Sequence, residues 1–292
     1  MACMSNTFIL RTLANDAGTA MVSDHGAHLT FWKPACQSTP VVWQPRSIFL
    51  GEDTAIRGGI PVIFPWFNGG YAHGGPTARK PKHGFARVSP WTLDESTLTD
   101  AHARYTLDSA SIGQELLDRF TSGPDPRFHA ELDIHAADTL SVSLRVENTG
   151  DAPIAYETAL HTYFRVGDVT RTRVIGLEHA TYLDGTSPDF PVCEQGDMPV
   201  AFDGTVLDRI YYSEDELRIE DEALERTIIV GKSGSPQTVV WNPGQEGGDR
   251  MADMRAGEWR DFVCVEAAAN RDRPIVLAPG ESHTIGQSVR VA

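Results

Sequence analysis

The chain has 292 residues, of which 41% are hydrophobic and 22% charged, and its formal net charge at pH 7 is −15. That length suits one large domain or two ordinary ones, and the charge opposes non-specific binding to nucleic acid or an anionic membrane surface. No apolar stretch approaches a membrane span, and the N-terminus lacks the pattern of a signal peptide. The four cysteines, Cys3, Cys36, Cys193 and Cys264, are scattered, which predicts reduced thiols and a cytoplasmic protein.

Alternation of apolar and polar residues predicts β-strands along much of the chain. Residues 130–134 and 140–146 alternate with period two, and the polar segment between them suits a hairpin loop. Residues 227–230 and 237–241 predict another strand pair, joined by a turn rich in glycine and serine. Strands at this spacing, separated by turn residues, are typical of an all-β sandwich.

Few segments predict helices. Residues 111–119 suit a short helix, whereas residues 215–226 are ambiguous: Leu217 and Leu224 fit a helix face, and Leu217 and Ile219 fit a strand. The chain has no linker, low-complexity tract or internal repeat, so we expect one domain over residues 1–292.

A segment without acidic residues interrupts this acidic chain. Residues 54–93 contain no Asp or Glu but five cationic side chains, namely Arg57, Arg79, Lys80, Lys82 and Arg87. For any one lysine, a solvated loop is the simpler interpretation. Arginines, however, bind phosphate or carboxylate through a planar fork, and two of them have a favourable context. Arg57 precedes a Gly-Gly pair that would let the backbone approach a ligand, and Arg87 follows a flexible loop, residues 68–82, that could fold over one.

Two ionisable residues lie in apolar surroundings far apart in the sequence. His161 is within the aromatic run of residues 156–164, and Glu266 follows the apolar residues 262–265. Such groups are usually paired or functional, because burying a lone charge is costly. Strand alternation would also place Glu157, His161, Tyr163 and Arg165 on one face, which is polar enough to line a cleft.

Six motifs occur in an order that resembles one known family. They are Arg-Gly-Gly-Ile-Pro (57–61), His-Gly-Phe-Ala-Arg (83–87), Ala-Leu-His-Thr-Tyr-Phe (159–164), Asp-Arg-Ile-Tyr (208–211), Trp-Asn-Pro-Gly (241–244) and Phe-Val-Cys-Val-Glu (262–266). Together they resemble the glucose-6-phosphate 1-epimerases, or D-hexose-6-phosphate mutarotases, of the aldose 1-epimerase superfamily.

The resemblance implies a β-supersandwich of the galactose mutarotase type. It also implies interconversion of the α and β anomers of a hexose 6-phosphate without metal or cofactor. By this analogy Glu266 is the base that removes the O1 proton, and His161 is the acid that protonates the ring oxygen. Such proton transfers each contribute roughly 10²–10⁴ in rate.

The resemblance also assigns residues to substrate binding. Arg57 and Arg87 correspond to the phosphate-binding cations. Lys82 falls where relatives often carry an uncharged side chain, so it either adds a third cation or is solvated. Asp208 corresponds to an acceptor for sugar hydroxyls, or is a turn residue, and His83 either contacts the sugar or holds the loop.

Two weaker candidates and the remaining histidines complete the set. Trp66 either stacks on a pyranose face or packs in the core, and Asp203 more simply marks an Asp-Gly turn. None of the ten histidines shows metal-ligand spacing such as HExxH, so no metal site is predicted.

Two alternative functions follow from the same residues. A mutarotase of unphosphorylated sugars has no need of paired arginines, and a non-catalytic sugar-phosphate-binding regulatory protein has no need of a matched acid and base. We therefore expect a hexose 6-phosphate as the partner molecule, with neither nucleic acid nor membrane, and a monomeric protein.

Overall fold

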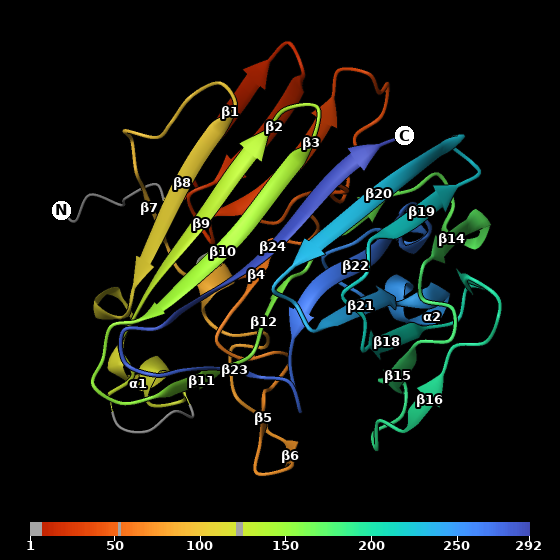
Figure 1. Cartoon of the computed structure of the whole chain (residues 1–292). Helices are drawn as coiled ribbons and strands as arrows, with labels where there is room; N and C mark the ends of the chain where they lie inside the picture. The colour runs from red at the N-terminus through yellow and green to blue at the C-terminus, as the bar shows by residue number, and fades with distance from the viewer. Residues whose placement is uncertain (1–7, 52–53, 121–124) are drawn as a thin grey trace.

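Two large β-sheets dominate the structure (Figure 1). The computed structural model describes residues 8–51, 54–120 and 125–292, so Cys3 lies outside the described residues. Every pairing between its strands is antiparallel. None of the helices in this part of the chain has the length and hydrophobicity needed to cross a bilayer.

The larger sheet has nine strands and forms one layer of the molecule. Its central strands alternate buried and more exposed residues, as expected for a sheet with one face on the core. In hydrogen-bonding order the strands are β17 (Val200–Ala201), β14 (Thr172–Ile175), β19 (Leu217–Asp221), β20 (Arg226–Ser233), β24 (Ser282–Val291), β10 (Leu140–Asn148), β9 (Phe128–Ala136), β8 (His102–Asp108) and β7 (Thr92–Leu93).

The second large sheet has eight strands and carries the candidate site. Its central strand β22 is buried at every position, because side chains cover both of its faces. The order is β16 (Val192–Glu194), β15 (Thr181–Asp184), β18 (Leu207–Tyr211), β21 (Gln237–Asn242), β22 (Phe262–Ala269), β12 (Thr158–Leu160) and β4 (Val62–Ile63), and β13 (Tyr163–Arg165) also pairs with β22.

The remaining elements are short or lie beside these sheets. Three strands form a separate sheet, β1 (Leu10–Asn15), β2 (Gly18–Ser23) and β3 (His28–Pro34). Two further pairs join β11 (Ile154–Tyr156) to β23 (Ile275–Leu277) and β5 (Tyr71–Ala72) to β6 (Gly75–Pro76). The helices are α1 (Gln114–Leu117), α2 (Gly244–Asp249) and four 3₁₀ turns, η1 (Ala86–Val88), η2 (Ser109–Ser111), η3 (Val169–Arg171) and η4 (Glu258–Asp261).

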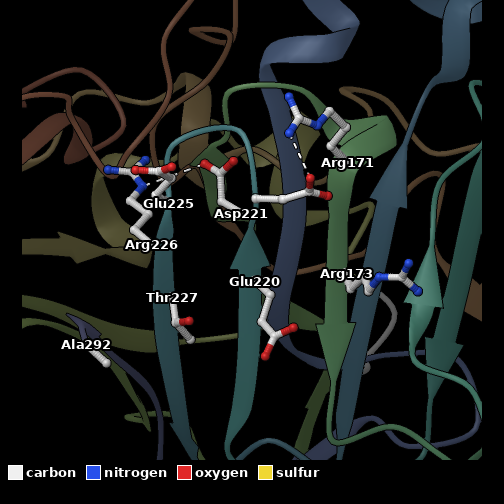
Figure 2. A pocket seen from close by; sticks show the side chains of 9 residues that line it. Arg171, Arg173, Glu220, Asp221, Glu225, Arg226, Thr227 and Ala292 are labelled. Atoms are coloured by element: carbon white, nitrogen blue, oxygen red, sulfur yellow. Dashed lines mark hydrogen bonds and ion pairs between the residues drawn. The ribbon is translucent and has the colours of Figure 1, made fainter.

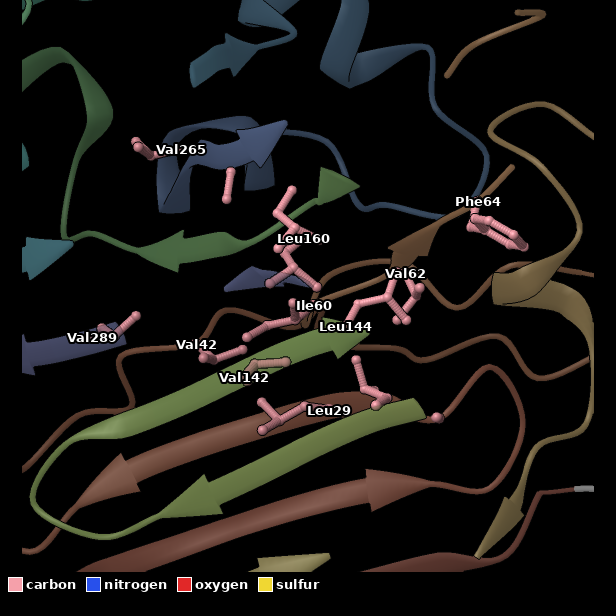
Figure 3. Packing of buried hydrophobic residues seen from close by; sticks show 14 of the residues in the cluster. Leu29, Val42, Ile60, Val62, Phe64, Val142, Leu144, Leu160, Val265 and Val289 are labelled. Atoms are coloured by element: carbon pink, nitrogen blue, oxygen red, sulfur yellow. The ribbon is translucent and has the colours of Figure 1, made fainter. Parts of the chain in front are cut away.

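One apolar cluster joins the two large sheets. Leu144 of β10 and Val289 of β24, from the nine-stranded sheet, belong to the same cluster as Leu160 of β12 and Val265 of β22 (Figure 3). All four are at most 1% exposed. Burial of each such side chain contributes about 1.5–3 kcal/mol, so this cluster holds the layers together. The sandwich predicted from the sequence is confirmed.

Local predictions had mixed outcomes. The hairpin between residues 130 and 146 is confirmed by the pairing of β9 with β10, and the ambiguous segment contains strand β19. The predicted helix over 111–119 shortens to Gln114–Leu117. The predicted pairing of residues 227–230 with 237–241 is wrong: β20 and β21 belong to different sheets, so the intervening turn crosses between layers.

Candidate active site

A cavity of about 140 Å³ lies on the face of the eight-stranded sheet that points away from the nine-stranded one. It is smaller than the roughly 300–1,000 Å³ typical of pockets for drug-sized ligands, which favours a small substrate. All seven residues predicted from the sequence line it, together with Phe67, Asn68, Tyr163, Val239, Trp241 and Met251.

Strand alternation aims Glu266 into this cavity. Its neighbours Val265 and Ala267 on β22 belong to the core cluster between the sheets. Side chains of a strand alternate between faces, so Glu266 lies on the opposite face with Cys264 and Ala268, which belong to two other clusters.

His161 occupies a break between two strands. β12 ends at Leu160 and β13 begins at Tyr163, so the predicted continuous strand through residue 161 is wrong. The His161 backbone N–H instead donates to the carbonyl of Pro61 at 3.1 Å. His161 and Tyr163 still line the cavity together, with their rings stacked 4.9 Å apart. Glu157 does not join them, because its carboxylate accepts backbone N–H groups of Phe67 and Tyr71.

The imidazole and the carboxylate face each other. Nδ1 of His161 lies 3.3 Å from Oε1 of Glu266, and the two residues are 7% and 1% exposed. Burial raises the pKa of Glu266 well above its usual value, and the charge of Asp208 adds to this effect. Burial lowers the pKa of His161, as do the charges of Arg87 and Arg57. Neutral forms are therefore favoured at both groups.

Arg57 is held by two partners at the rim of the cavity. Its Nε donates to Oδ2 of Asp253 at 2.9 Å, Nη2 lies 2.9 Å from the same oxygen, and Nη1 donates to the Tyr163 hydroxyl at 2.9 Å. A guanidinium has five N–H donors. These contacts use three, so one N–H remains on each terminal nitrogen for a ligand.

Arg87 is a second cation, and it is less well satisfied. Its Nη2 donates to the carbonyl of Lys82 at 2.7 Å. Its Nε is buried without a hydrogen-bond partner among the described residues. Burial lowers the pKa of Arg87 to about 10, with the nearby charge of Arg57 acting in the same direction. Lys82 also lines the cavity but is exposed. The cavity thus holds cationic charge for which an anionic ligand would be a suitable partner.

His83 is fixed in one tautomer by the chain itself. Its Nδ1 accepts the backbone N–H of Asn68 at 3.2 Å, and burial lowers its pKa well below the usual value. The neutral ring therefore carries its proton on Nε2. The next residue, Gly84, has φ of +77°, and a Cβ there would lie 2.0 Å from the Phe64 carbonyl oxygen. This close packing places His83 beside the cavity.

Asp208 lies on β18, opposite Trp241 of β21. Burial raises its pKa to about 6, while the charge of Lys82 opposes the shift. No turn-type pairing with its neighbour is needed, since Arg209 bonds to Gln195 and Tyr211 instead. Asp208 is therefore available as a polar acceptor in the cavity.

A second cavity shows the contrasting arrangement, in which cations are neutralised by the protein (Figure 2). It has a volume of about 360 Å³ near the end of β19 and the start of β20. There Arg171 pairs with Glu222 at 2.8 Å, and the buried Arg226 lies 3.7 Å from Asp221. Arg226 of β20 also donates to the carbonyl of Arg165 in β13 at 2.7 Å, so its guanidinium links a strand of the nine-stranded sheet to a strand of the eight-stranded sheet.

Three sequence interpretations change in the structure. A Cβ on Gly59 would lie 2.3 Å from both His28 Nε2 and the Leu29 carbonyl oxygen, so the Gly-Gly pair serves packing and not ligand approach. Trp66 is fully buried and donates to the Pro81 carbonyl, which makes it a core residue. Asp203 caps its own turn through Thr205 and lines a different cavity.

The sequence placed Tyr163 on the same face as His161, but it assigned neither Tyr163 nor Asp253 a contact with Arg57. Tyr163 lies within a motif, but its hydroxyl contact could not be inferred from the strand pattern. Asp253 lies in a segment of loops and turns with no periodic signal, and it is 196 positions from Arg57 in the chain. Its only sequence signal is its place between two motifs.

One cluster could accept a metal by residue type. His102 and His135 both place Nε2 within hydrogen-bonding distance of Asp133 Oδ1, at 3.0 and 2.8 Å. Arg104 also pairs with Asp133 at 2.7 Å and neutralises its charge. The cluster lies on the exposed side of β8 and β9, and none of its members lines the candidate site.

The fold and the site define a β-sandwich protein with a buried imidazole–carboxylate pair in a small polar cavity. The family model for aldose 1-epimerase matches residues 10–290. The chain therefore belongs to the aldose 1-epimerase family, and it is an isomerase that interconverts sugar anomers.

Individual relatives support the same assignment. A protein of Escherichia coli K12 named "Putative glucose-6-phosphate 1-epimerase" is 35% identical over 276 residues, which covers 91% of this chain and 85% of that protein. A protein of the same name from Cenchrus ciliaris is 32% identical and covers 88% of this chain and 76% of its own length. The crystal structure of "a putative mutarotase (YeaD)" from Salmonella typhimurium superposes with a TM-score of 0.81 at 26% identity, covering 100% and 96% of the two chains.

Proposed function

We propose that this isomerase acts on hexose 6-phosphates, with D-glucose 6-phosphate as the substrate. The observation that carries the proposal is the presence, in one cavity, of a buried imidazole–carboxylate pair and three cationic side chains. The pair suits proton transfer at the anomeric centre, and the cations suit a phosphate dianion. The names of the relatives from E. coli and Cenchrus ciliaris agree with the phosphate preference.

In the proposed reaction, Glu266 as carboxylate removes the proton from the anomeric O1. The C1–O5 bond breaks, its electron pair goes to O5, and O5 takes a proton from protonated His161. Rotation about C1–C2 then turns the other face of the aldehyde toward the ring oxygen. Closure reverses each transfer, so the anomer changes while both residues return to their starting state.

The pair keeps one proton throughout this cycle. Before ring opening the proton is on His161, and after ring opening it is on Glu266. No net charge enters or leaves the buried pair, so the low-polarity surroundings impose no additional charging cost on the transfer. The neutral form of the pair, which burial favours, is the form that exists with the open-chain sugar.

The cations are proposed to bind the phosphate group. Arg57 would use the two N–H donors that Asp253 and Tyr163 leave open, and Arg87 would use its unsatisfied Nε. Lys82 would add a third charge at the exposed side. Asp208 would accept from a sugar hydroxyl, and His83 would donate from Nε2. All of these residues line one cavity of this chain, so the proposed reaction needs no residue from a second subunit, and we propose a monomer.

The test is α/β exchange of glucose 6-phosphate, measured by magnetisation-transfer NMR with free glucose alongside. We expect exchange to fall about 10²–10⁴-fold in His161→Ala and Glu266→Gln. Arg57→Ala should raise KM by about 10- to 100-fold, since it removes charge-assisted bonds to the phosphate. Arg171→Ala removes an exposed arginine at the other cavity and should leave exchange unchanged. Exchange of free glucose at the same kcat/KM as glucose 6-phosphate would refute the proposed substrate.

A further inference from the structure

One side chain connects the phosphate-binding end of the cavity to the proton-transferring end. The hydroxyl of Tyr163 accepts from Arg57 Nη1 at 2.9 Å, and its ring stacks on His161 with an interplanar angle of 5°. Tyr163 is 3% exposed, so water is largely excluded between the two ends. A charge bound at Arg57 therefore acts on His161 through a medium of low polarity, in which electrostatic interactions are strong.

The groups around His161 carry an excess of positive charge on one side. Arg87, Arg57 and Lys82 each disfavour a proton on its ring, whereas Glu266 lies at 3.3 Å on the other side. The rings that contact it from His83, Tyr163 and Trp241 are packed against it at 4.9–6.0 Å. Burial keeps His83 neutral and opposes ionisation of Tyr163, so neither of these rings offsets the three cations.

We propose that a dianionic oxyanion held by Arg57, Arg87 and Lys82 activates the His161–Glu266 pair, so that the substrate's phosphate accelerates ring opening as well as anchoring the sugar. This inference rests on the proposed function. Three cations act on His161 but only Arg87 among them acts on Glu266, so a dianion that offsets them favours, on balance, the form of the pair with its proton on His161. That is the form that ring opening requires. Phosphate specificity is then expressed in kcat as well as in KM.

The size of the effect follows from Coulomb's law. The proton moves between two groups 3.3 Å apart, so the effect depends on the difference in the anion's potential between them. At an effective dielectric constant of about 20, a dianion roughly 10 Å from His161 and about 3 Å farther from Glu266 shifts this equilibrium by about fourfold. The activating anion need not be attached to the sugar, because its action is electrostatic. Phosphite, a small dianion with the geometry of a phosphate ester, can therefore replace the missing group when free glucose is the substrate.

The experiment measures exchange of free glucose by the wild-type protein as phosphite is added at constant ionic strength. The rate of glucose exchange with phosphite but without protein is subtracted, since phosphite is itself a weak base catalyst. The range of phosphite concentrations is chosen around the concentration at which phosphite halves the exchange rate of glucose 6-phosphate. We expect saturable acceleration of glucose exchange by about fourfold. Arg87→Met should lose this acceleration, and Lys80→Ala, in the same positive segment but outside the cavity, should retain it.

A second measurement does not depend on phosphite. With glucose 6-phosphate, Arg87→Met should lower kcat as well as raise KM. Phosphite that inhibits glucose 6-phosphate exchange yet leaves glucose exchange unchanged would overturn the inference, as would a change confined to KM in Arg87→Met. Both results leave the proposed function intact, whereas that function itself fails if the wild-type protein does not accelerate exchange of glucose 6-phosphate.

Discussion

Replacing Glu266 by Gln should lower the exchange rate about 10²–10⁴-fold while making the fold more stable. Glu266 is 1% exposed, and its Oε2 has no hydrogen-bond partner among the described residues. Glutamine has almost the same shape, and its amide can donate to Nδ1 of His161, which lies 3.3 Å from the carboxylate. The substitution therefore removes an ionisable group from a buried position without leaving a cavity.

The gain in stability should depend on pH. Below the usual glutamic acid pKa of 4.5, the carboxyl is protonated in both the folded and the unfolded chain, so its ionisation does not lower the stability of the native state. Because burial raises the folded pKa, the unfolded chain releases its proton first as the pH increases, and the native state loses about 1.4 kcal/mol per pH step. At pH 7 this loss is at most about 3.5 kcal/mol. Glu266→Gln should recover about 1–3 kcal/mol near pH 7 and almost nothing near pH 4.5.

Denaturant unfolding at pH 4.5, 6 and 8, together with NMR exchange, measures both effects. Glu157→Gln is a matched control, because Glu157 is also buried but accepts backbone N–H groups of Phe67, Tyr71 and Arg271. The amide NH₂ of glutamine would face one of these backbone N–H donors, so Glu157→Gln should lower the free energy of unfolding by about 1–3 kcal/mol. A stability difference between Glu266→Gln and wild type that does not change with pH would refute the prediction, as would wild-type exchange in the variant.

Three further predictions concern binding and packing. Arg57→Lys should raise KM for glucose 6-phosphate about tenfold in the exchange assay, because lysine lacks the planar fork; an unchanged KM would mean that charge alone suffices. The kcat/KM of the wild type should rise as the pH increases through about 6, where Asp208 ionises. Asp208→Asn should flatten this rise. The substrate phosphate titrates equally with both proteins, so the difference between the two profiles reports on Asp208. Gly84→Ala should lower the free energy of unfolding by about 3 kcal/mol or more, since its Cβ would meet the Phe64 carbonyl oxygen at 2.0 Å and φ is +77°. A denaturant unfolding midpoint equal to that of the wild type would contradict this prediction.

The residue pattern predicted the fold class correctly, but of the two strand pairs it predicted, one was right and one was wrong. The hairpin of β9 and β10 was predictable because period-two alternation and a short loop act locally. The pairing of residues 227–230 with 237–241 failed for the opposite reason, since the turn after β20 leads into the other sheet. Sequence patterns show that a strand has a buried face, but not which sheet covers it.

For the candidate site, the sequence by itself determined which residue types are present and in what order. The fold brings all seven residues assigned from the family resemblance to one cavity, and the absence of acidic residues from positions 54–93 marked the cationic side. Only the tertiary structure placed Glu266 opposite His161 and Asp253 against Arg57. Those pairs are separated by 105 and 196 positions, and contacts over such distances depend on how strands are arranged in sheets, for which local periodicity carries no signal.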